Sequence, residues 1–522
     1  VAALYAEGYF SASVSIQLAG REASGLNAFN PPAELAPIVI AVDLGRRFTF
    51  GRAEITPVAP EAVGGEGFAS GAPAGTATIV AAGSQAIADW RAASHAKAEI
   101  TGQQIIARHR DGELDVALTV DPGPALTFGD LVLPPDPPVR PDRILQIAGL
   151  PTGDPFDPTA VALARTRLVA TGAFNAVVVS EADEVGPDNT LDILLGVEAA
   201  KPRRLGFGAE VDSTDGLNLQ AFWMHRNILG GAERLRFDLE VDGIGGGSGG
   251  TDFKFSGGLR IPGYRRPDDT LELGFNLEDL DQENFDEQLI EVGVRRSRKV
   301  NETLEVSGYA ALRVSEATDA FGTNQFQHIL LSASATRDFR DDQLNPRNGT
   351  YGALELRPFI AVGQGDTGFR IEGDFRAYRA LGECTVAAGR LQLASVLFAG
   401  LEGTPPEFLF FSGGGGTVRG QAFESLGIEV SGDTTGGRGF AGLSLELRQD
   451  ITESIGVVGF FDYGYVTEDG TFEGGDGHAG GGFALRYNTA LGPLRVDLGV
   501  PVGDASAEDT DYALYIGLGQ AF

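Results

Sequence analysis

Residues 203–522 alternate apolar and polar side chains at every second position, and this long alternation limits the possible folds more than any other feature. LRFDLEV at 235–241 is one example, and TLELGFNLE, GALELRPFIAV, FAGLSLELR and PLRVDLGV continue the pattern. A period of two sends successive side chains to opposite faces of a β-strand, whereas an amphipathic helix repeats about every 3.6 residues. We therefore expect this region to consist of β-strands.

The connections between these strands fall into two alternating classes. Seven are short and tight, such as NILGG, RKVNET and NTALGP at 488–493. Eight are Gly/Asp-rich, from the short STDG at 213–216 to TEDGTFEGGDG and GDASAED at 503–509. Seven turns interleaved with eight loops predict sixteen strands, and this arrangement is typical of a transmembrane antiparallel β-barrel of the outer membrane. The alternative, a soluble β-sandwich, would have shorter strands and more closely spaced turns.

Residues 1–202 mix helical and strand patterns, and their plan recurs. RFTFGRAEI at 47–55 resembles ALTFGDLVL at 125–133. A helix that runs through a small residue into a strand also recurs, with equivalent pairs at Gly8 and Phe10, Ser94 and Ala96, and Gly172 and Phe174. The middle pair lacks both the glycine and the aromatic residue, so we interpret the middle copy as degenerate. A repeat of this kind predicts small α+β modules, each with a strand, helices and two further strands.

The repeat divides the chain into modules at residues 1–46, 47–123 and 124–202, followed by the barrel at 203–522; a single α+β domain is the alternative to the three modules. The chain opens in mid-pattern, so we expect the first module to be truncated and a signal peptide to have been removed. Exposed sheet edges in such modules suit the binding of extended peptide. The third module is expected to pack closest to the barrel, because only two residues separate them.

Composition excludes several classes of protein. A net charge of −32 with no basic stripe argues against a nucleic-acid partner. The single cysteine, Cys384, excludes an internal disulfide framework, and the five scattered histidines show no metal-binding spacing. No run of 18 apolar residues is present, so no transmembrane helix is expected. We predict no metal and no cofactor.

A long loop at 402–440 interrupts the strand pattern and contains TPPEFLFFSGGGGTVRGQAFESLG. Its four consecutive glycines are costly to order, so a fixed loop needs an anchor. Arg419 carries a permanent charge that can make a two-pronged contact with a carboxylate. Strand parity points Glu446 and Asp462 into the barrel. We predict that Arg419 pairs with one or both and holds the loop inside. The alternative leaves Arg419 at the surface and both acids solvated.

The motifs around these residues resemble those of the BamA/TamA superfamily of outer-membrane assembly barrels. TVRGQAFESLG resembles its VRG(F/Y) loop motif, and SLEL with Glu446 and FFDYG with Asp462 resemble the partner motifs. TALGPLRVDLGVPVGD and YIGLGQAF resemble the TamA branch, which carries three POTRA modules before a sixteen-stranded barrel. One departure concerns the aromatic residue expected after Arg419 and Gly420: Gln421 stands there, and the next aromatic residue is Phe423.

The resemblance implies a non-enzymatic translocation and assembly factor in the outer membrane of a Gram-negative cell, with the POTRA modules in the periplasm. It implies a TamB-like inner-membrane-anchored partner and, as clients, autotransporters and other outer-membrane proteins. It also implies contact with outer-membrane lipid, including a role in moving phospholipid between membranes. The alternatives within the superfamily are a two-partner secretion transporter, normally with two POTRA modules, and a BamA-type insertase, usually with five.

Three other functions remain to be weighed. A hydrolase would use Glu446 and Asp462 as a carboxylate pair, but an arginine between them keeps both ionised and works against a general acid. A phosphate-binding glycine loop at 413–416 would need a following GK[ST] motif, which is missing. A passive porin is the remaining alternative, and a loop held in the lumen argues against it.

Glycines mark the two strands that must close the barrel. Gly206 and Gly208 lie in the first strand, RLGFGAEV, and Gly517 and Gly519 in the last, YIGLGQAF. Glycine packs nothing in a strand and loosens it. An open seam in lipid must find another hydrogen-bonding partner, and a client strand would provide one. We predict a lateral seam here; the alternative is that the glycines only relieve crowding.

The last strand is expected to carry an apolar face that ends at Phe522. The residues expected on that face are Tyr512, Leu514, Ile516, Leu518 and Phe522.

Overall fold

The structure, a computed structural model, describes residues 2–18, 21–25, 38–212, 216–246, 249–489, 492–503 and 512–522. Most of STDG, most of GDASAED and the centre of NTALGP lie outside these residues. The chain forms two compact units. The amino-terminal unit comprises residues 1–137, 148–166 and 176–198, and the barrel unit comprises residues 138–147, 167–175 and 199–522.

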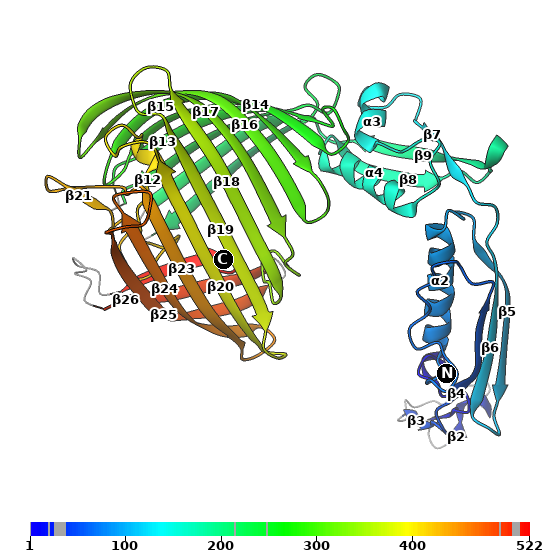
Figure 1. The fold of residues 1–522 in the computed structure, drawn as a ribbon. Coiled ribbons are helices and arrows are strands. Elements are labelled where there is room, and N and C mark those ends of the chain that lie inside the picture. Colours follow the sequence, from blue (N-terminus) through cyan, green and yellow to red (C-terminus); the bar gives the residue numbers. More distant parts are fainter. Residues whose placement is uncertain are drawn as a thin grey trace. The chain divides into compact units, whose positions relative to one another are not determined.

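The barrel unit contains a sixteen-stranded antiparallel sheet in which each strand pairs with its neighbours along the chain (Figure 1). Its first half is β10 (Arg203–Asp212), β11 (Gly216–His225), β12 (Arg234–Ile244), β13 (Asp252–Pro262), β14 (Asp269–Asp281), β15 (Asp286–Lys299), β16 (Leu304–Asp319) and β17 (Gly322–Asp338). Its second half is β18 (Gly349–Ala361), β19 (Gly368–Ala380), β20 (Thr385–Leu397), β23 (Gly439–Asp450), β24 (Ile455–Thr467), β25 (Asp476–Thr489), β26 (Gly492–Val502) and β27 (Ala513–Leu518). The predicted number of strands is confirmed.

The alternation of the sequence becomes an alternation of burial in β23. Leu443, Leu445 and Leu447 face outward and are exposed in the isolated chain, as lipid-facing side chains of a barrel are. Glu446 and Arg448 face inward and are buried. Apolar side chains therefore cover the outside of the barrel, and charged side chains occupy its interior.

The amino-terminal unit holds small three-stranded sheets. The first has the order β2-β1-β3 and is accompanied by α1 (Ala2–Ala6) and η1 (Ala23–Gly25). The next two have the orders β4-β6-β5 and β7-β9-β8, with β4 parallel to β6 and β7 parallel to β9. The strands are β1 (Ser13–Leu18), β2 (Arg21–Glu22), β3 (Ile38–Asp43), β4 (Thr49–Thr56), β5 (Glu99–Arg108), β6 (Glu113–Asp121), β7 (Thr127–Val132), β8 (Phe174–Glu181) and β9 (Thr190–Ala199).

The helices differ between the second and third sheets. The second sheet has the single helix α2 (Thr76–Ala92), whereas α3 (Pro141–Ala148) and α4 (Pro158–Ala170) lie between the strands of the third, before η2 (Pro187–Asn189). The expectation of more than one helix in the middle copy was wrong within the described residues. Segment 57–75 is rich in glycine and proline, which disfavour helix. None of the helices in the described ranges is long and apolar enough to cross a membrane.

The three helix-to-strand junctions share one backbone conformation. Gly8, Ser94 and Gly172 have φ values of 91°, 72° and 69°. The carbonyl of Gly8 accepts a hydrogen bond from the N–H of Phe48 at 2.9 Å, and that of Ser94 accepts one from Leu126 at 2.9 Å. The middle copy has therefore lost the glycine but kept the left-handed turn and the hydrogen bond to the segment that follows.

Three segments from the range 124–202 belong to the barrel unit, at residues 138–147, 167–175 and 199–202. Arg143 is buried, and its guanidinium donates to the Pro262 carbonyl oxygen at 2.5 Å. Arg167 makes a two-pronged contact with the Asp268 carboxylate at 2.7 and 2.8 Å. Both arginines thus bind the β13–β14 hairpin, Arg143 at the last residue of β13 and Arg167 in the turn.

Candidate functional site

Much of the long loop between β20 and β23 is buried against the inner wall of the barrel, whereas residues 431–433 are exposed. It includes η3 (Pro406–Phe408) and the hairpin of β21 (Ile428–Val430) and β22 (Asp433–Thr435). Two of its residues, Phe408 and Arg419, are 1% and 2% exposed. The loop is therefore packed at two separate places.

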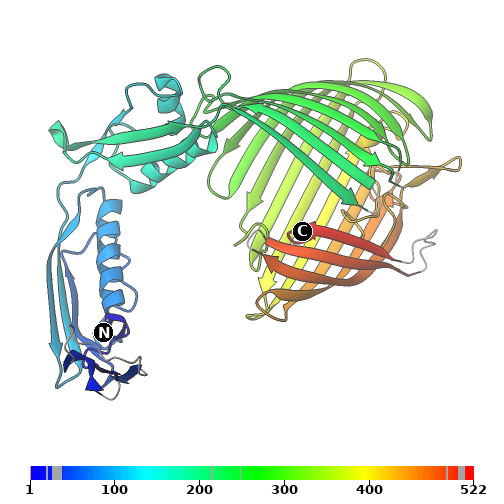
Figure 2. The same cartoon turned by 180° about the vertical axis from the view of Figure 1, so that it is seen from behind.

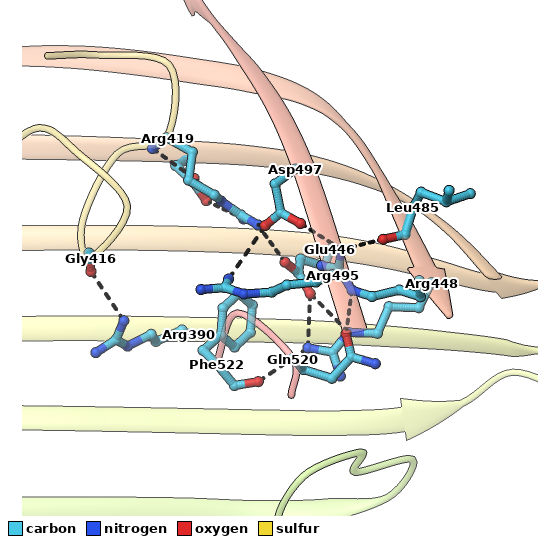
Figure 3. A network of polar contacts seen from close by, with 12 residues as sticks. Arg390, Gly416, Arg419, Glu446, Arg448, Leu485, Arg495, Asp497, Gln520 and Phe522 are labelled. Carbon is cyan, nitrogen blue, oxygen red and sulfur yellow. Dashed lines mark hydrogen bonds and ion pairs between the residues drawn. The ribbon is translucent and has the colours of Figure 1, made fainter. Parts of the chain in front are cut away.

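Arg419 is the centre of the first of these places (Figure 3). Its Nε and Nη2 donate to the two Asp462 carboxylate oxygens at 2.7 and 3.0 Å, and its Nη1 donates to Glu446 Oε1 at 2.8 Å. The backbone N–H of Arg419 adds a bond to Asp462 Oδ2 at 3.1 Å. The guanidinium carbon also lies 3.8 Å from the centroid of the Phe460 ring. The structure thus brings Arg419, Glu446 and Asp462 together.

A third carboxylate, which the sequence analysis missed, completes the site. Asp497 in β26 is fully buried and accepts a hydrogen bond from Arg419 Nη1 at 3.2 Å. Its neighbours Val496 and Leu498 are exposed on the outer face, so parity in PLRVDLGV indicates an inward Asp497. Parity alone does not show that β26 places this residue level with Glu446 and Asp462.

Further arginines keep these carboxylates paired. Arg448 Nε donates to Glu446 Oε2 at 2.8 Å, and Arg486 Nη1 donates to Asp497 Oδ1 at 2.5 Å. Each of the two carboxylates therefore binds a second arginine in addition to Arg419. Removing one partner of a buried ion pair typically costs about 3–5 kcal/mol, because it leaves a charge without a partner. We call Arg419, Glu446, Asp462 and Asp497 the loop lock.

Glycines make room for the loop lock. Gly420 has a φ of 96°, and a Cβ there would lie 2.6 Å from the Val500 backbone nitrogen. A Cβ at Gly480 in β25 would lie 2.0 Å from the Arg419 carbonyl oxygen, and one at Gly499 in β26 would lie 2.7 Å from the Gly420 nitrogen. We call Gly480 and Gly499 the glycine floor. The floor was not predicted, because the sequence does not show which glycines the loop covers.

The four consecutive glycines are ordered by side chains at their ends. The N–H of Gly413 donates to Thr417 Oγ1 at 2.8 Å, and that hydroxyl donates back to the Gly413 carbonyl oxygen at 2.9 Å. Arg390 Nη1 donates to the Gly416 carbonyl oxygen at 3.2 Å (Figure 3). These contacts offset the entropy of ordering glycine, so Arg419 is not the only anchor of this run.

Gln421 makes a polar contact at the position where the family has an aromatic residue. Its side chain is buried, and its Nε2 donates to the Ala479 carbonyl oxygen at 2.7 Å. Phe423 is half-buried and lies against Gly414, where an added Cβ would come within 3.0 Å of the ring. A hydrogen bond to β25 therefore occupies this position instead of ring packing.

The second buried part of the loop centres on Phe408. Arg313, Arg357 and Arg370 place their guanidinium carbons 4.9, 5.9 and 5.8 Å from the ring centroid. Arg370 Nε also donates to the Phe408 carbonyl oxygen at 3.1 Å. We call these three arginines the arginine collar. Cation–π contacts of this kind contribute about 0.5–2 kcal/mol each.

The neighbouring Glu407 strengthens this second contact. Arg313 in β16 donates to Glu287 Oε1 at 2.8 Å and pairs with Glu407 of the loop. Arg313 and Glu287 are both buried. The collar lies on β16, β18 and β19, whereas the lock acids lie on β23, β24 and β26. The loop is thus attached to two different parts of the barrel wall.

Three of the four glycines predicted for the seam lie in the terminal strands. Gly206 and Gly208 lie in β10 and Gly517 in β27, but Gly519 follows the end of β27, and its N–H donates to the Pro493 carbonyl oxygen at 2.7 Å. β10 and β27 stand at opposite ends of the sheet order, and no ladder joins them in the described part of the chain (Figure 2). Phe207 and Ile516, on these two strands, are 78% and 68% exposed.

Phe522 lies inside the barrel, so its expected place on the outer apolar face was wrong. Gly519 has a φ of 88°, which breaks the alternation of the strand. The Phe522 ring is 6% exposed and lies 6.5 Å from the Tyr378 ring, centroid to centroid. The carbonyl oxygen of Phe522 accepts a hydrogen bond from Arg448 Nη2 at 3.2 Å (Figure 3). Phe522 therefore contacts an arginine of the lock region instead of lipid.

One carboxyl group of the loop titrates near neutral pH. Burial raises the pKa of Glu424 to about 7, the Asn284 side chain opposes this rise, and the nearby Glu283 and Asp252 carboxylates add to it. A raised pKa favours the protonated folded form. The contribution of protonated Glu424 to loop packing is therefore complete at pH values below its ordinary pKa near 4.5. This contribution is lost as the pH rises through about 7.

We expect the amides around Glu424 to exchange at least about tenfold faster at pH 8.5 than at pH 5.5, after correction for intrinsic exchange, because ionisation places a third negative charge beside Glu283 and Asp252. Hydrogen exchange with mass spectrometry measures this. Glu424→Gln is the matched control and should remove the pH dependence. An equal pH effect in both proteins would contradict the role of Glu424.

Comparisons with known proteins agree with this architecture. The model of the Omp85 superfamily domain matches residues 202–522. BamA from Haemophilus ducreyi lacking POTRA domains 1–3 has a similar structure, with a TM-score of 0.66 and 16% identity over 86% of this chain and 94% of that one. CdiB from Acinetobacter baumannii gives a TM-score of 0.50 and 12% identity over 90% of this chain and 88% of that one. CdiB from Escherichia coli gives 0.50 and 11% over 90% of each chain.

A search of curated proteins finds no match. Identities this low indicate a shared fold and do not indicate shared clients. The family match spans the barrel, the loop and all the acids of the lock. The chain belongs to the Omp85 superfamily.

Proposed function

We propose that this protein is a TamA-like factor that inserts or secretes autotransporters and other outer-membrane proteins. Membership of the Omp85 superfamily supports the wider class, which is non-catalytic assembly or translocation of proteins at the outer membrane of Gram-negative bacteria. The observation that carries the proposal is the pair of terminal strands, β10 and β27, that share no ladder within the described residues. In lipid, the hydrogen-bonding groups of such edges need partners, and an incoming client strand supplies them.

The anchored loop supports assembly over passive diffusion. A loop attached both to the lock and to the collar occupies the interior of the barrel, where a porin needs an open channel. The lock carboxylates are all engaged by guanidinium groups, which favours a structural role over general acid catalysis.

The remaining assignments are part of the same proposal. We assign residues 1–46, 47–123 and 124–202 to three POTRA modules in the periplasm, and the three small sheets in this range support that number. A TamB-like protein anchored in the inner membrane is the proposed partner, and phospholipid transport is an added role. A two-partner secretion transporter is the second candidate, because two CdiB structures share the fold over 90% of this chain. A BamA-type insertase is a further alternative.

Reconstitution tests the proposal. The purified full chain in liposomes should fold urea-denatured client barrels, including an autotransporter with its β-domain, at least about tenfold faster than empty liposomes do. Folding is followed by the gel-mobility shift of folded barrels. A secreted passenger with no barrel of its own is the second substrate. Transport of that passenger alone would favour two-partner secretion, and no acceleration of any barrel client would contradict the proposal.

A further inference from the structure

The inner wall of the barrel has a second charged site, distinct in its residues from the loop lock. It is a cavity of about 250 Å³ across β12, β13, β14 and β15, and four arginines line it. The arginines are Arg234, Arg236, Arg260 and Arg295. We call this cavity the arginine bowl.

The strand register places these arginines in unfavourable proximity. Arg234 stands directly opposite Arg260 in the β12–β13 ladder. Arg260 in turn stands opposite Glu272, which stands opposite Arg295. Like charges in directly opposed positions destabilise a sheet, because their Cβ atoms are only about 4.5–5.5 Å apart. This row has three guanidinium groups and a single carboxylate.

The ion pairs of the bowl do not neutralise it. Arg236 Nε donates to Asp238 Oδ2 at 2.7 Å, whereas no ion pair is formed by Arg234, Arg260 or Arg295 with any described residue. Asp238 and Glu272 are the only carboxylates among the lining residues. The bowl therefore carries an excess of positive charge, although the whole chain has a net charge of −32. Arg419 of the lock and Arg313 of the collar, in contrast, are paired with the buried carboxylates of Glu446 and Glu287.

Three glycines and the ring of Tyr309 form the base of the bowl. Gly258 pairs with Gly274, which pairs with Gly293, so three glycines lie side by side on adjacent strands. The Tyr309 side chain covers Gly293, where an added Cβ would lie 2.4 Å from the hydroxyl oxygen, and the Arg295 guanidinium carbon lies 4.6 Å from the centroid of that ring. Ser256 and Asn276, which also line the cavity and pair with each other in the ladder, add neutral hydrogen-bonding groups.

We propose that the arginine bowl binds a phosphate group. Guanidinium groups form two-pronged bonds with phosphate oxygens, and they keep their charge at every physiological pH. A phosphate anion between Arg234 and Arg260 replaces their mutual repulsion by attraction of both to the anion. A cavity of about 250 Å³ has room for roughly eight waters at ~30 Å³ each, so the phosphate can carry a further group. A phospholipid headgroup and a soluble phosphate share this chemistry.

Calorimetric titration of the purified full chain in nonionic micelles tests the proposal, at constant ionic strength and in buffer without phosphate. One arm adds inorganic phosphate, and the other adds dihexanoyl phosphatidylglycerol. We expect at least one to bind about tenfold or more tightly to the wild type than to Arg234→Gln/Arg260→Gln. Binding of the lipid alone identifies a headgroup site. Equal binding of both probes identifies a site for soluble phosphates.

The matched control is Arg337→Gln/Arg379→Gln, which removes two charges from exposed positions outside the bowl. It should bind the probes as the wild type does. Ser256→Asp provides a second test if the first double variant fails to fold, because it adds a negative charge beside the glycines and should weaken binding at least tenfold. Equal binding by the wild type and the folded bowl variants, or an equal loss in the control, would overturn the proposal.

Discussion

Arg419→Ala should reduce the rate of client assembly about 100-fold while the loop stays attached to the barrel at Phe408. The change leaves Asp462 without its two-pronged partner, whereas Glu446 and Asp497 keep Arg448 and Arg486. Breaking a buried pair costs about 3–5 kcal/mol, and ~1.4 kcal/mol corresponds to a factor of ten. Hydrogen exchange should therefore show at least about 100-fold faster exchange at residues 418–424 and little change at 406–410.

Pore conductance shows whether the loop is attached to the barrel wall at one site or at two. The sequence predicts Arg419 as the anchor that holds the loop inside, but the arginine collar provides a second attachment. In planar bilayers, Arg419→Ala and Phe408→Ala should each conduct little, and the double variant should conduct at least about tenfold more than either. Arg419→Lys, which keeps the charge but loses the two-pronged contact, should be intermediate in assembly. A fully open pore in Arg419→Ala would show that the collar does not hold the loop.

Cross-linking the seam should nearly abolish client assembly. We expect Phe207→Cys/Ile516→Cys, made in a Cys384→Ser background, to lose at least about 90% of its assembly rate on oxidation, because a closed seam offers no free edge to a client strand. Reduction with dithiothreitol should restore the rate. The yield of cross-link also reports how often β10 and β27 meet, since the sheet does not join them in the described residues.

A second cysteine pair controls for the chemistry of oxidation. Leu391 and Leu443 stand opposite each other in neighbouring strands, and both are exposed on the outer face. Leu391→Cys/Leu443→Cys in the same background should keep its assembly rate when oxidised. Full activity in the oxidised seam variant would show that clients do not enter between the terminal strands.

The barrel can be predicted from the sequence because apolar and polar residues alternate regularly along its strands. Alternation assigns each side chain to a face, and the connections set the number of strands, so the inward positions of Glu446 and Asp462 follow from parity. Periodicity does not fix how far neighbouring strands are shifted along one another. Asp497 was missed for this reason, and so was the row that places Arg234 opposite Arg260.

Local backbone conformation limits the prediction elsewhere. Phe522 continues the apolar alternation in sequence, but the left-handed turn at Gly519 ends the alternation before it. The collar escaped prediction because its residues come from a loop and from three strands that lie far apart in sequence. At Gln421 the sequence shows a departure from the family motif, but it does not show the hydrogen bond that this side chain donates to the Ala479 carbonyl oxygen.

The glycine floor has a consequence for how this protein can evolve. Gly480 and Gly499 lie on strands, yet the space above them is occupied by the backbone of the loop at Arg419 and Gly420. The loop and these two strands are therefore expected to change together during evolution. Consider a chimera that combines the loop of this protein with β25 and β26 of a relative that has side chains at positions 480 and 499. Those side chains would occupy the space of the loop backbone at Arg419 and Gly420, so Arg419 could not reach its carboxylates. Exchange between members of the superfamily should move β25, β26 and the loop together.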